Sequence, residues 1–327
     1  MSYRLSECPL CEGTRFTPLL RAKDYHYGNI GEFTLVQCAD CTLCFQDPMY
    51  TDVELSNFYP KDYYSFNDRF SAPTRYRAFK ATVGRLLGVR EGPPTKDPKF
   101  ERPGRMLDVG CGSGWFISKM RDKGWDVWGV EPNVAAAKYG AQKKGLDIFP
   151  GSLLDARFAS ESFDYVRLNH SFEHIEHPGL VLNEIHRIMA NNGKLMIGVP
   201  NRAGFNARIF GPYWWHLALP LHTFSYSVDT LSRMLQKYRF NIEQVIYNSD
   251  HAGFQGSIQI YINRNHPLPR SQGRFFGSRL ARLLCSWLAH IQNALQVSDS
   301  IEITATKQSQ YSQNREKLRS ALAESRG

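Results

Sequence analysis

Met106-Leu-Asp-Val-Gly-Cys-Gly-Ser-Gly114 combines a short apolar run with three closely spaced glycines. The apolar residues predict a strand over 105–110, and the residues after the glycines predict a helix over 113–123. Glycine suits the loop between them, because it adopts backbone conformations that other residues avoid and lets a ligand approach the backbone closely. A strand, a glycine-rich turn and a helix N-terminus in this order indicate a nucleotide-like ligand.

A second strand, predicted over 125–131, ends at Glu131. A carboxylate about twenty residues beyond the first glycine can accept hydrogen bonds from ribose hydroxyls. The glycine spacing is G-x-G-x-G, however, and differs from the G-x-G-x-x-G of dinucleotide-binding folds. The residues therefore indicate a nucleoside ligand but do not identify it. Two alternatives stay open: a nicotinamide or flavin site, and a glycine-rich turn that binds no ligand.

Taken together, the glycine run and Glu131 resemble the first two motifs of class I S-adenosylmethionine-dependent methyltransferases. The resemblance implies S-adenosyl-L-methionine as cofactor and an α/β fold with a Rossmann-like seven-stranded methyltransferase sheet. It places the cofactor against residues of four strand ends and loops: Asp108, Gly110, Gly112, Gly114, Glu131, Leu154, Asp155 and Asn169.

Strand and helix patterns alternate along the middle of the chain. The predicted strands are 105–110, 125–131, 146–150, 163–169 and 194–199, and the predicted helices are 113–123, 133–144 and 178–190. Such alternation predicts a parallel sheet covered on both faces, with the ligand at the carboxyl ends of the strands. Segments 240–247, 257–262 and 300–306 also alternate as strands, and two of these three should complete the sheet.

The first 44 residues hold five of the seven cysteines. They form two C-x-x-C pairs, Cys8 with Cys11 and Cys38 with Cys41, followed by Cys44. Two such pairs offer four thiolates to a tetrahedral ion, and four thiolates leave no open position for a substrate. We therefore expect a structural zinc bound by Cys8, Cys11, Cys38 and Cys41, with Cys44 as a spare or substitute ligand.

The candidate catalytic residues follow the strand at 163–169. His170, Glu173 and His174 are spaced i, i+3, i+4, so on a helix they would share one face. The run resembles the Glu-His motif of ubiquinone-biosynthesis-type methyltransferases. Three interpretations stay open: His174 or His170 is a general base, the three residues bind a divalent cation, or they brace the loop.

An aromatic insertion over 201–226 should cover the carboxyl edge of the sheet and select the acceptor. Its Pro-Leu-His222-Thr-Phe-Ser segment resembles a pattern of the same family, although Leu221 stands where relatives have an arginine. The resemblance makes His222 a further catalytic candidate. Stacking of the insertion on a sugar or aromatic ring competes with ordinary core packing.

The formal net charge of +9 admits a nucleic acid, an anionic substrate or a membrane surface as partner. No run reaches the roughly 20 apolar residues that span a bilayer, and the N-terminus lacks the apolar centre of a signal peptide, so we expect a cytoplasmic protein. An apolar stripe at helical spacing over 280–295 could dock a partner subunit, rest on a membrane or pack on its own domain.

The expected domain organisation follows from these segments. Residues 1–48 form a zinc-binding ribbon, 49–101 a connector with a helix, 102–307 the methyltransferase domain with an amphipathic helical insertion at 270–298, and 308–327 a polar tail.

The resemblance extends to zinc-ribbon-bearing methyltransferases of bacterial polysaccharide and deoxysugar biosynthesis. It implies a small-molecule acceptor, such as a nucleotide-linked or lipid-linked sugar or a related metabolite. An RNA methyltransferase with a zinc module is the second hypothesis, because the chain is basic. A non-catalytic scaffold that retains the fold is the third, against which the intact glycines and Glu131 weigh.

Overall fold

The computed structural model describes residues 2–59, 102–265 and 273–308. Most of the connector over 49–101 and nearly all of the tail over 308–327 lie outside these residues.

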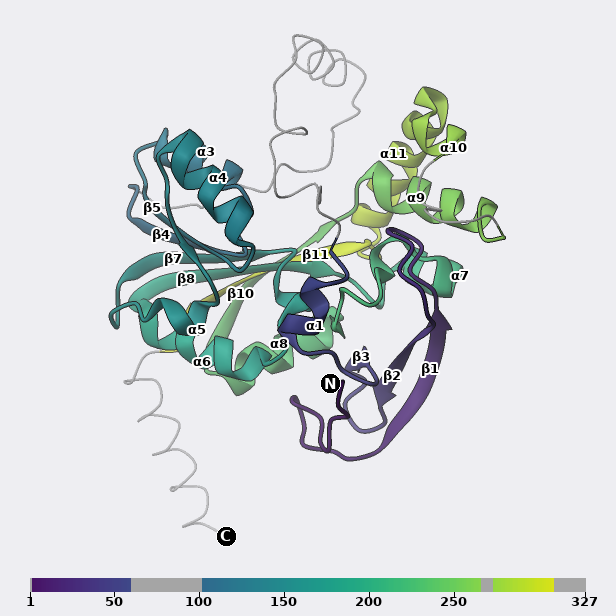
Figure 1. The fold of residues 1–327 in the computed structure, drawn as a ribbon, viewed down its shortest axis with the longest axis horizontal. Coiled ribbons are helices and arrows are strands. Elements are labelled where there is room, and N and C mark those ends of the chain that lie inside the picture. The colour runs from purple at the N-terminus through teal and green to yellow at the C-terminus, as the bar shows by residue number, and fades with distance from the viewer. Residues whose placement is uncertain (1, 60–101, 266–272, 309–327) are drawn as a thin grey trace.

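Seven strands form the central sheet in the order β10-β11-β8-β7-β4-β5-β6 (Figure 1). They are β4 (Arg105–Val109), β5 (Asp126–Glu131), β6 (Asp147–Pro150), β7 (Phe163–Asn169), β8 (Met189–Pro200), β10 (Phe240–Asn248) and β11 (Ser300–Lys307). Strands β4 to β8 run parallel, and β11 runs antiparallel to β8 and β10. The predicted α/β fold with a Rossmann-like seven-stranded sheet is confirmed.

Helices cover both faces of the sheet, so the side chains of its central strands are buried on both sides. Figure 1 shows α3 (Trp115–Arg121) and α4 (Val134–Lys144) on one face, and α5 (Leu153–Ala156), α6 (Pro178–Ile188) and α8 (Val228–Lys237) on the other. Side chains of β4 and β7 are buried almost throughout.

The strand order reverses beside β4. From β4, the chain continues outward through β5 and β6 on one side and through β7 and β8 on the other. In such sheets the loops at the carboxyl ends of the strands separate at this point and leave room for a ligand. The loops after β4, β5 and β7 therefore meet at one edge, as predicted.

The strand predicted over 257–262 is wrong. These residues belong to α9 (His251–Ile262), which Asp250 caps by accepting hydrogen bonds from the backbone of Ala252 and Gly253. The isoleucine alternation suggested a strand because glutamine and serine at the other positions look like surface residues. They are buried instead, and the Gln255 side chain donates to the carbonyls of residues 275, 276 and 278.

Strands β10 and β11 are therefore the two that complete the sheet. Between them, α9 packs with α10 (Arg274–Gly277) and α11 (Arg279–Ala294) as a helical lobe at the sheet's edge (Figure 1). The helix α11 coincides, to within one residue at each end, with the apolar stripe expected over 280–295.

The N-terminal residues form a second, four-stranded sheet in the order β1-β2-β3-β9. Three strands come from the N-terminal segment: β1 (Phe16–Ala22), β2 (Phe33–Cys38) and β3 (Cys44–Gln46), with α1 (Asp52–Ser56) after them. The fourth, β9 (Phe224–Ser225), comes from the aromatic insertion and pairs with β3. The N-terminal module is thus joined to the insertion by a shared sheet.

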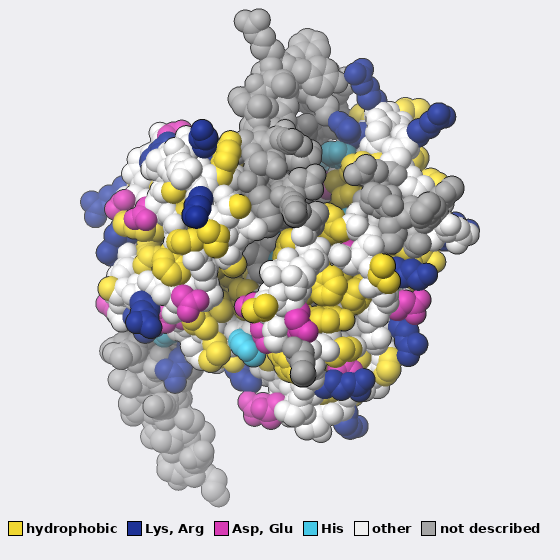
Figure 2. Space-filling view, viewed as in Figure 1, with side chains coloured by type: hydrophobic (Ala, Val, Ile, Leu, Met, Phe, Trp, Pro, Cys, Tyr) yellow, Lys and Arg dark blue, Asp and Glu magenta, His cyan; other side chains and the backbone are white. Residues whose placement is uncertain are grey.

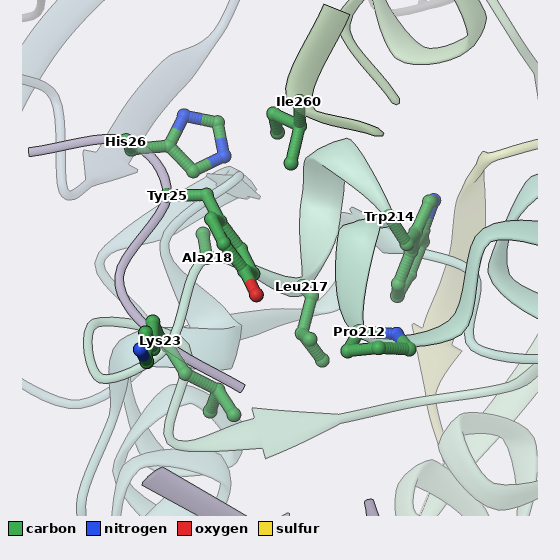
Figure 3. A pocket seen from close by; sticks show the side chains of 9 residues that line it. Lys23, Tyr25, His26, Pro212, Trp214, Leu217, Ala218 and Ile260 are labelled. Carbon is green, nitrogen blue, oxygen red and sulfur yellow. The ribbon is translucent and has the colours of Figure 1, made fainter. Parts of the chain in front are cut away.

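The rest of the aromatic insertion holds α7 (Phe205–Phe210) and two 3₁₀ turns, η4 (Gly211–Tyr213) and η5 (Trp215–Leu217). Figure 3 shows Trp214, Leu217 and Ile260 around a small pocket, facing Tyr25 and His26 from the loop after β1. Trp214 is buried and its indole Nε1 donates to the carboxylate of Asp299, 2.9 Å away. Much of the insertion's aromatic content therefore serves packing between the module, α9 and the start of β11.

Candidate functional site

The glycine loop after β4 adopts the backbone conformation that its sequence predicts. Gly110, Gly112 and Gly114 have φ values of +77°, +55° and +74°, in the left-handed region that favours glycine. A Cβ on Gly110 would lie 2.4 Å from Cβ of Ser171, so the loop after β7 also requires glycine there. The loops that follow β4 and β7 are in contact.

Glu131 fastens the same loop from the end of β5. One carboxylate oxygen accepts from the backbone N–H of Gly112 and the other from that of Asn133, both at 2.8 Å. Burial raises the pKa of Glu131, and the two backbone hydrogen bonds oppose this rise. A carboxylate can accept about four hydrogen bonds, so capacity remains for two ribose hydroxyls. The remaining acceptor capacity of Glu131 therefore fits the hydroxyl groups of a nucleoside ribose.

Asp108 lies inside the sheet in a buried ion pair. Its carboxylate accepts from Arg167 on β7, with distances of 2.9 and 3.1 Å from the guanidinium Nη1. Burial raises the pKa of Asp108, while Arg167 lowers it. The guanidinium also lies 3.8 Å from the centre of the Phe116 ring on α3. Asp108 thus links β4, β7 and α3 beneath the glycine loop.

Sequence reasoning missed Arg167. The available signal was a charged residue inside a run predicted to be a buried strand, since buried charges are almost always paired.

The other predicted cofactor residues lie around the same edge. Asn169 ends β7 beside Gly198, whose added Cβ would lie 2.7 Å from the Asn169 amide oxygen. Leu154 is exposed on α5, and the neighbouring Asp155 accepts a hydrogen bond of 2.6 Å from the Ser152 hydroxyl. Their cofactor roles stay predictions.

Glu173 is the buried centre of a histidine cluster. It lies in a 3₁₀ turn, η3 (Phe172–His174), and is only 1% exposed. Its oxygen Oε1 lies 3.5 Å from Nδ1 of His170 and 3.9 Å from Nε2 of His222. Although burial raises the pKa of Glu173, His170 and the other histidines lower it to about 2. The i, i+3, i+4 spacing would place these side chains on one face of an α-helix, whereas the structure has a 3₁₀ turn here. The turn still brings His170 and Glu173 together.

His174 and His222 each use one ring nitrogen to hold a backbone carbonyl. Nδ1 of His174 lies 2.9 Å from the carbonyl oxygen of Leu221, and Nδ1 of His222 lies 2.8 Å from that of His216. Burial lowers the pKa of His174, and it lowers that of His222 to about 3. Both rings are therefore neutral near pH 7. The carbonyl contacts favour the tautomer with the proton on Nδ1, and the Tyr59 hydroxyl also lies 3.0 Å from Nδ1 of His174.

His170 has a different environment. Its side chain is 38% exposed, and its backbone has a φ of +53°, which is rare for a residue with a Cβ. Burial lowers its pKa, but the nearby Glu173 carboxylate outweighs this effect, so the net pKa is raised. His216 stacks on it with ring centres 6.2 Å apart. Strain of this kind collects at functional sites.

The four predicted zinc ligands converge. Each of Cys8, Cys11, Cys38 and Cys41 brings its sulfur to within 4.8 Å of the others, with 3.4 Å between the sulfurs of Cys8 and Cys41. Four thiol sulfurs at this spacing fit a tetrahedral zinc ion. Cys44 stands apart, because its thiol contacts the Thr42 carbonyl and the Gln37 amide.

Comparisons with known proteins bear on the catalytic domain. A family described as "Methyltransferase domain" matches residues 75–245. A ubiquinone biosynthesis O-methyltransferase of Rhodopseudomonas palustris is 29% identical over 157 residues, covering 44% of this chain and 62% of the relative. A demethylmenaquinone methyltransferase of Renibacterium salmoninarum is 30% identical over 110 residues, covering 33% of this chain and 44% of the relative. The chain thus spans less than two thirds of the length of these curated relatives.

Among solved structures, a SAM-dependent methyltransferase from Archaeoglobus fulgidus is similar at 18% identity. Its TM-score is 0.45, and the alignment covers 74% of this chain and 98% of that one.

The family match, unlike the pairwise similarities, extends over more than half of the 327 residues. It includes the glycine loop, Glu131 and the turn with Glu173. The protein therefore belongs to the methyltransferase-domain family, and the predicted class of enzyme is confirmed at the level of the family.

Proposed function

We propose that the protein transfers a methyl group from S-adenosyl-L-methionine to a hydroxyl group of a small metabolite, a sugar or a sugar-related compound. The observation that carries the proposal is the contact between the glycine loop and the loop of the Glu173 turn. Gly110 abuts Ser171, whose hydroxyl donates to the carbonyl of Val109 at 2.7 Å. A donor held on the first loop would lie beside the histidines of the second.

When bound, S-adenosyl-L-methionine supplies a methyl group on a positively charged sulfur. Glu131 would accept hydrogen bonds from its ribose, and the glycine loop would admit the amino acid portion close to the backbone. Because methyl transfer is an in-line displacement, correct placement of donor and acceptor supplies much of the acceleration. The rigid loops after β4 and β7 are suited to that placement.

His170 is the proton acceptor in this proposal. It is the partly exposed histidine of the cluster, and Glu173 stabilises its protonated form. A base of raised pKa takes the proton from the acceptor hydroxyl as the oxygen attacks the methyl carbon. His174 and His222, whose Nδ1 protons are held by carbonyls, shape the cluster around it.

A lipid-linked acceptor is favoured by the surface of α11. One face of this helix packs on α9, while seven apolar side chains on the other are 39–68% exposed: Leu280, Leu283, Leu284, Trp287, Leu288, Ile291 and Leu295. Residues 251–298 include five arginines and no lysine, aspartate or glutamate. Figure 2 shows basic and hydrophobic side chains together on the lobe of α10 and α11.

An apolar helix face within an acid-free, arginine-bearing segment matches an anionic lipid surface. Two copies of this segment would instead bring like charges together. None of the described helices is long and apolar enough to cross a membrane.

Cofactor binding tests the first part of the proposal. We expect Glu131→Ala to weaken S-adenosylmethionine binding by about 10- to 100-fold in calorimetry, because a charge-assisted hydrogen bond is worth roughly 1.5–3 kcal/mol. Asp147 lies at the amino end of β6, away from the strand ends that form the candidate site. The variant Asp147→Asn should therefore bind S-adenosylmethionine like the wild type. Equal binding by the wild type and Glu131→Ala would refute the assignment.

The base is tested by turnover. His170→Gln should lower kcat by about 10²- to 10⁴-fold, the usual contribution of general base catalysis, with little change in S-adenosylmethionine affinity. The raised pKa of His170 means that wild-type kcat should fall with decreasing pH at values above the ordinary histidine pKa. This acidic limb should vanish in His170→Gln, and a variant that keeps full turnover would exclude His170.

Cobalt substitution tests the zinc assignment. The wild type should show thiolate-to-cobalt absorption, and Cys11→Ser should lose most of it and unfold at a lower temperature, because metal binding supplies folding free energy. Cys44→Ser is the matched control, since Cys44 lies outside the cluster, and should retain the absorption. Loss of the absorption in both variants, or in neither, would contradict the four-ligand set.

Vesicle sedimentation tests the lipid surface. The protein should bind phosphatidylglycerol vesicles and not phosphatidylcholine vesicles. Leu284→Glu with Trp287→Glu should weaken binding on the order of 100-fold, since each buried side chain contributes about 1.5–3 kcal/mol. Leu180→Glu, at an exposed site on α6, should bind normally. A concentration-dependent dimer that the double variant abolishes, without vesicle binding, would point to a second copy instead.

A further inference from the structure

The imidazole of His216, in the aromatic insertion, packs against that of His170. The two ring planes are 14° from parallel and their centres are 6.2 Å apart, within the range of offset aromatic pairs. On its other side, Nε2 of His216 lies 3.2 Å from the position that a Cβ on Gly253 would take. His216 therefore fills the space between His170 and the first turn of α9.

The ring of His216 supports that of His170 without competing for a proton. Burial and the neighbouring His170 lower the pKa of His216 to about 4, so its ring is neutral near pH 7. A neutral ring does not repel a protonated neighbour. His170 needs support from its surroundings, because its backbone is strained at a φ of +53° and its side chain is 38% exposed.

The backbone that carries the His216 ring is held by three hydrogen bonds. Nε2 of His26 donates to the carbonyl oxygen of Trp215 at 2.7 Å. The backbone N–H of Trp215 donates to the Ser257 hydroxyl on α9 at 2.9 Å. Nδ1 of His222 lies 2.8 Å from the carbonyl oxygen of His216. Because these bonds come from the N-terminal module, from α9 and from the insertion itself, the turn η5 has little freedom to move.

His26 is the contribution of the N-terminal module to this turn. The buried carboxylate of Asp24 fixes the loop after β1, since it accepts from the backbone N–H groups of His26 and Tyr27 at 2.9 and 3.0 Å. The His26 ring also packs edge-on against the Trp215 ring, with centres 4.6 Å apart. The module therefore reaches the candidate site through His26 as well as through the pairing of β3 with β9.

We propose that His216 is a positioning residue for the proton acceptor His170, and that His26 holds His216 in place. This role rests on the proposed function. The proton of the acceptor hydroxyl passes to His170, the new O–C bond forms with the methyl carbon, and the S–C bond breaks with its electron pair remaining on sulfur. A ring confined between Glu173 and His216 has less rotational freedom to lose when the acceptor binds.

Two pairs of variants test the contacts by turnover. His26→Gln keeps a side-chain N–H for the Trp215 carbonyl and His26→Leu does not, while His216→Phe keeps a flat ring against His170 and His216→Ala does not. We expect the Leu and Ala variants to lower kcat by about 10- to 100-fold, the usual effect of misplacing a catalytic group. Their Gln and Phe counterparts should keep most of the turnover, and S-adenosylmethionine affinity should stay at the wild-type value in all four.

Imidazole resonances test the same placement without either substrate. In protein labelled with ¹³C at histidine, the signal of His170 is the one that His170→Gln removes. The spectra would be compared at one alkaline pH, at which imidazoles are neutral. His216→Ala and His26→Leu should shift the His170 signal, because they remove or displace the ring that packs on it. His26→Gln should leave the signal in place.

Cooperative thermal unfolding would show that each variant folds. Equal kcat in the two His26 variants, or an unmoved His170 signal in both His216→Ala and His26→Leu, would overturn the proposal. Because the spectra contain neither donor nor acceptor, they test the placement of His170 separately from its role as the base, which the turnover of His170→Gln tests.

Discussion

The pairing of β3 with β9 is the constraint on which the candidate site depends. Cys44 and Phe45 of β3 face Ser225 and Phe224 of β9, and the carbonyl of Thr223 accepts from the backbone of Gln46. His222 directly precedes this segment. Its position relative to Glu173 is therefore set by a strand pair, whereas an isolated loop of this length would sample many conformations.

The cysteine cluster acts on the site through the same pair. Cys38 ends β2 and Cys41 lies in the turn to β3, so the sulfurs that fit zinc also fix the hairpin to which β9 adds. The aromatic rings continue the connection: Phe45 packs on Phe224, which stacks on Tyr226, which in turn stacks on Phe172 beside Glu173. A metal ion held by the four cysteines would thus act on the candidate site without contacting either substrate.

Local patterns in the sequence predicted the parts of the fold whose burial follows a simple period. The strands around Gly110 and Glu131 and the helices between them were predictable, because hydrophobic spacing and glycine geometry act within about ten residues. The helix α9 was not, because Gln255 and Ser257 are buried by partners that the sequence does not reveal. His222 was suggested only by family resemblance, since its proximity to Glu173 arises from a strand pair across about 180 residues.

The buried carboxylate of Glu173 costs folding free energy but supplies a negative charge to the candidate site. An uncharged side chain would avoid the desolvation of a carboxylate, yet the chain places Glu173 in a turn where the imidazoles of His170 and His222 lie 3.5 and 3.9 Å from its oxygen Oε1. The surrounding apolar residues, Phe172 and Tyr226 among them, must offset that desolvation. Because the carboxylate stays ionised, it attracts the positive charge of a proton on His170. The same attraction would stabilise the proton released when an acceptor oxygen is methylated.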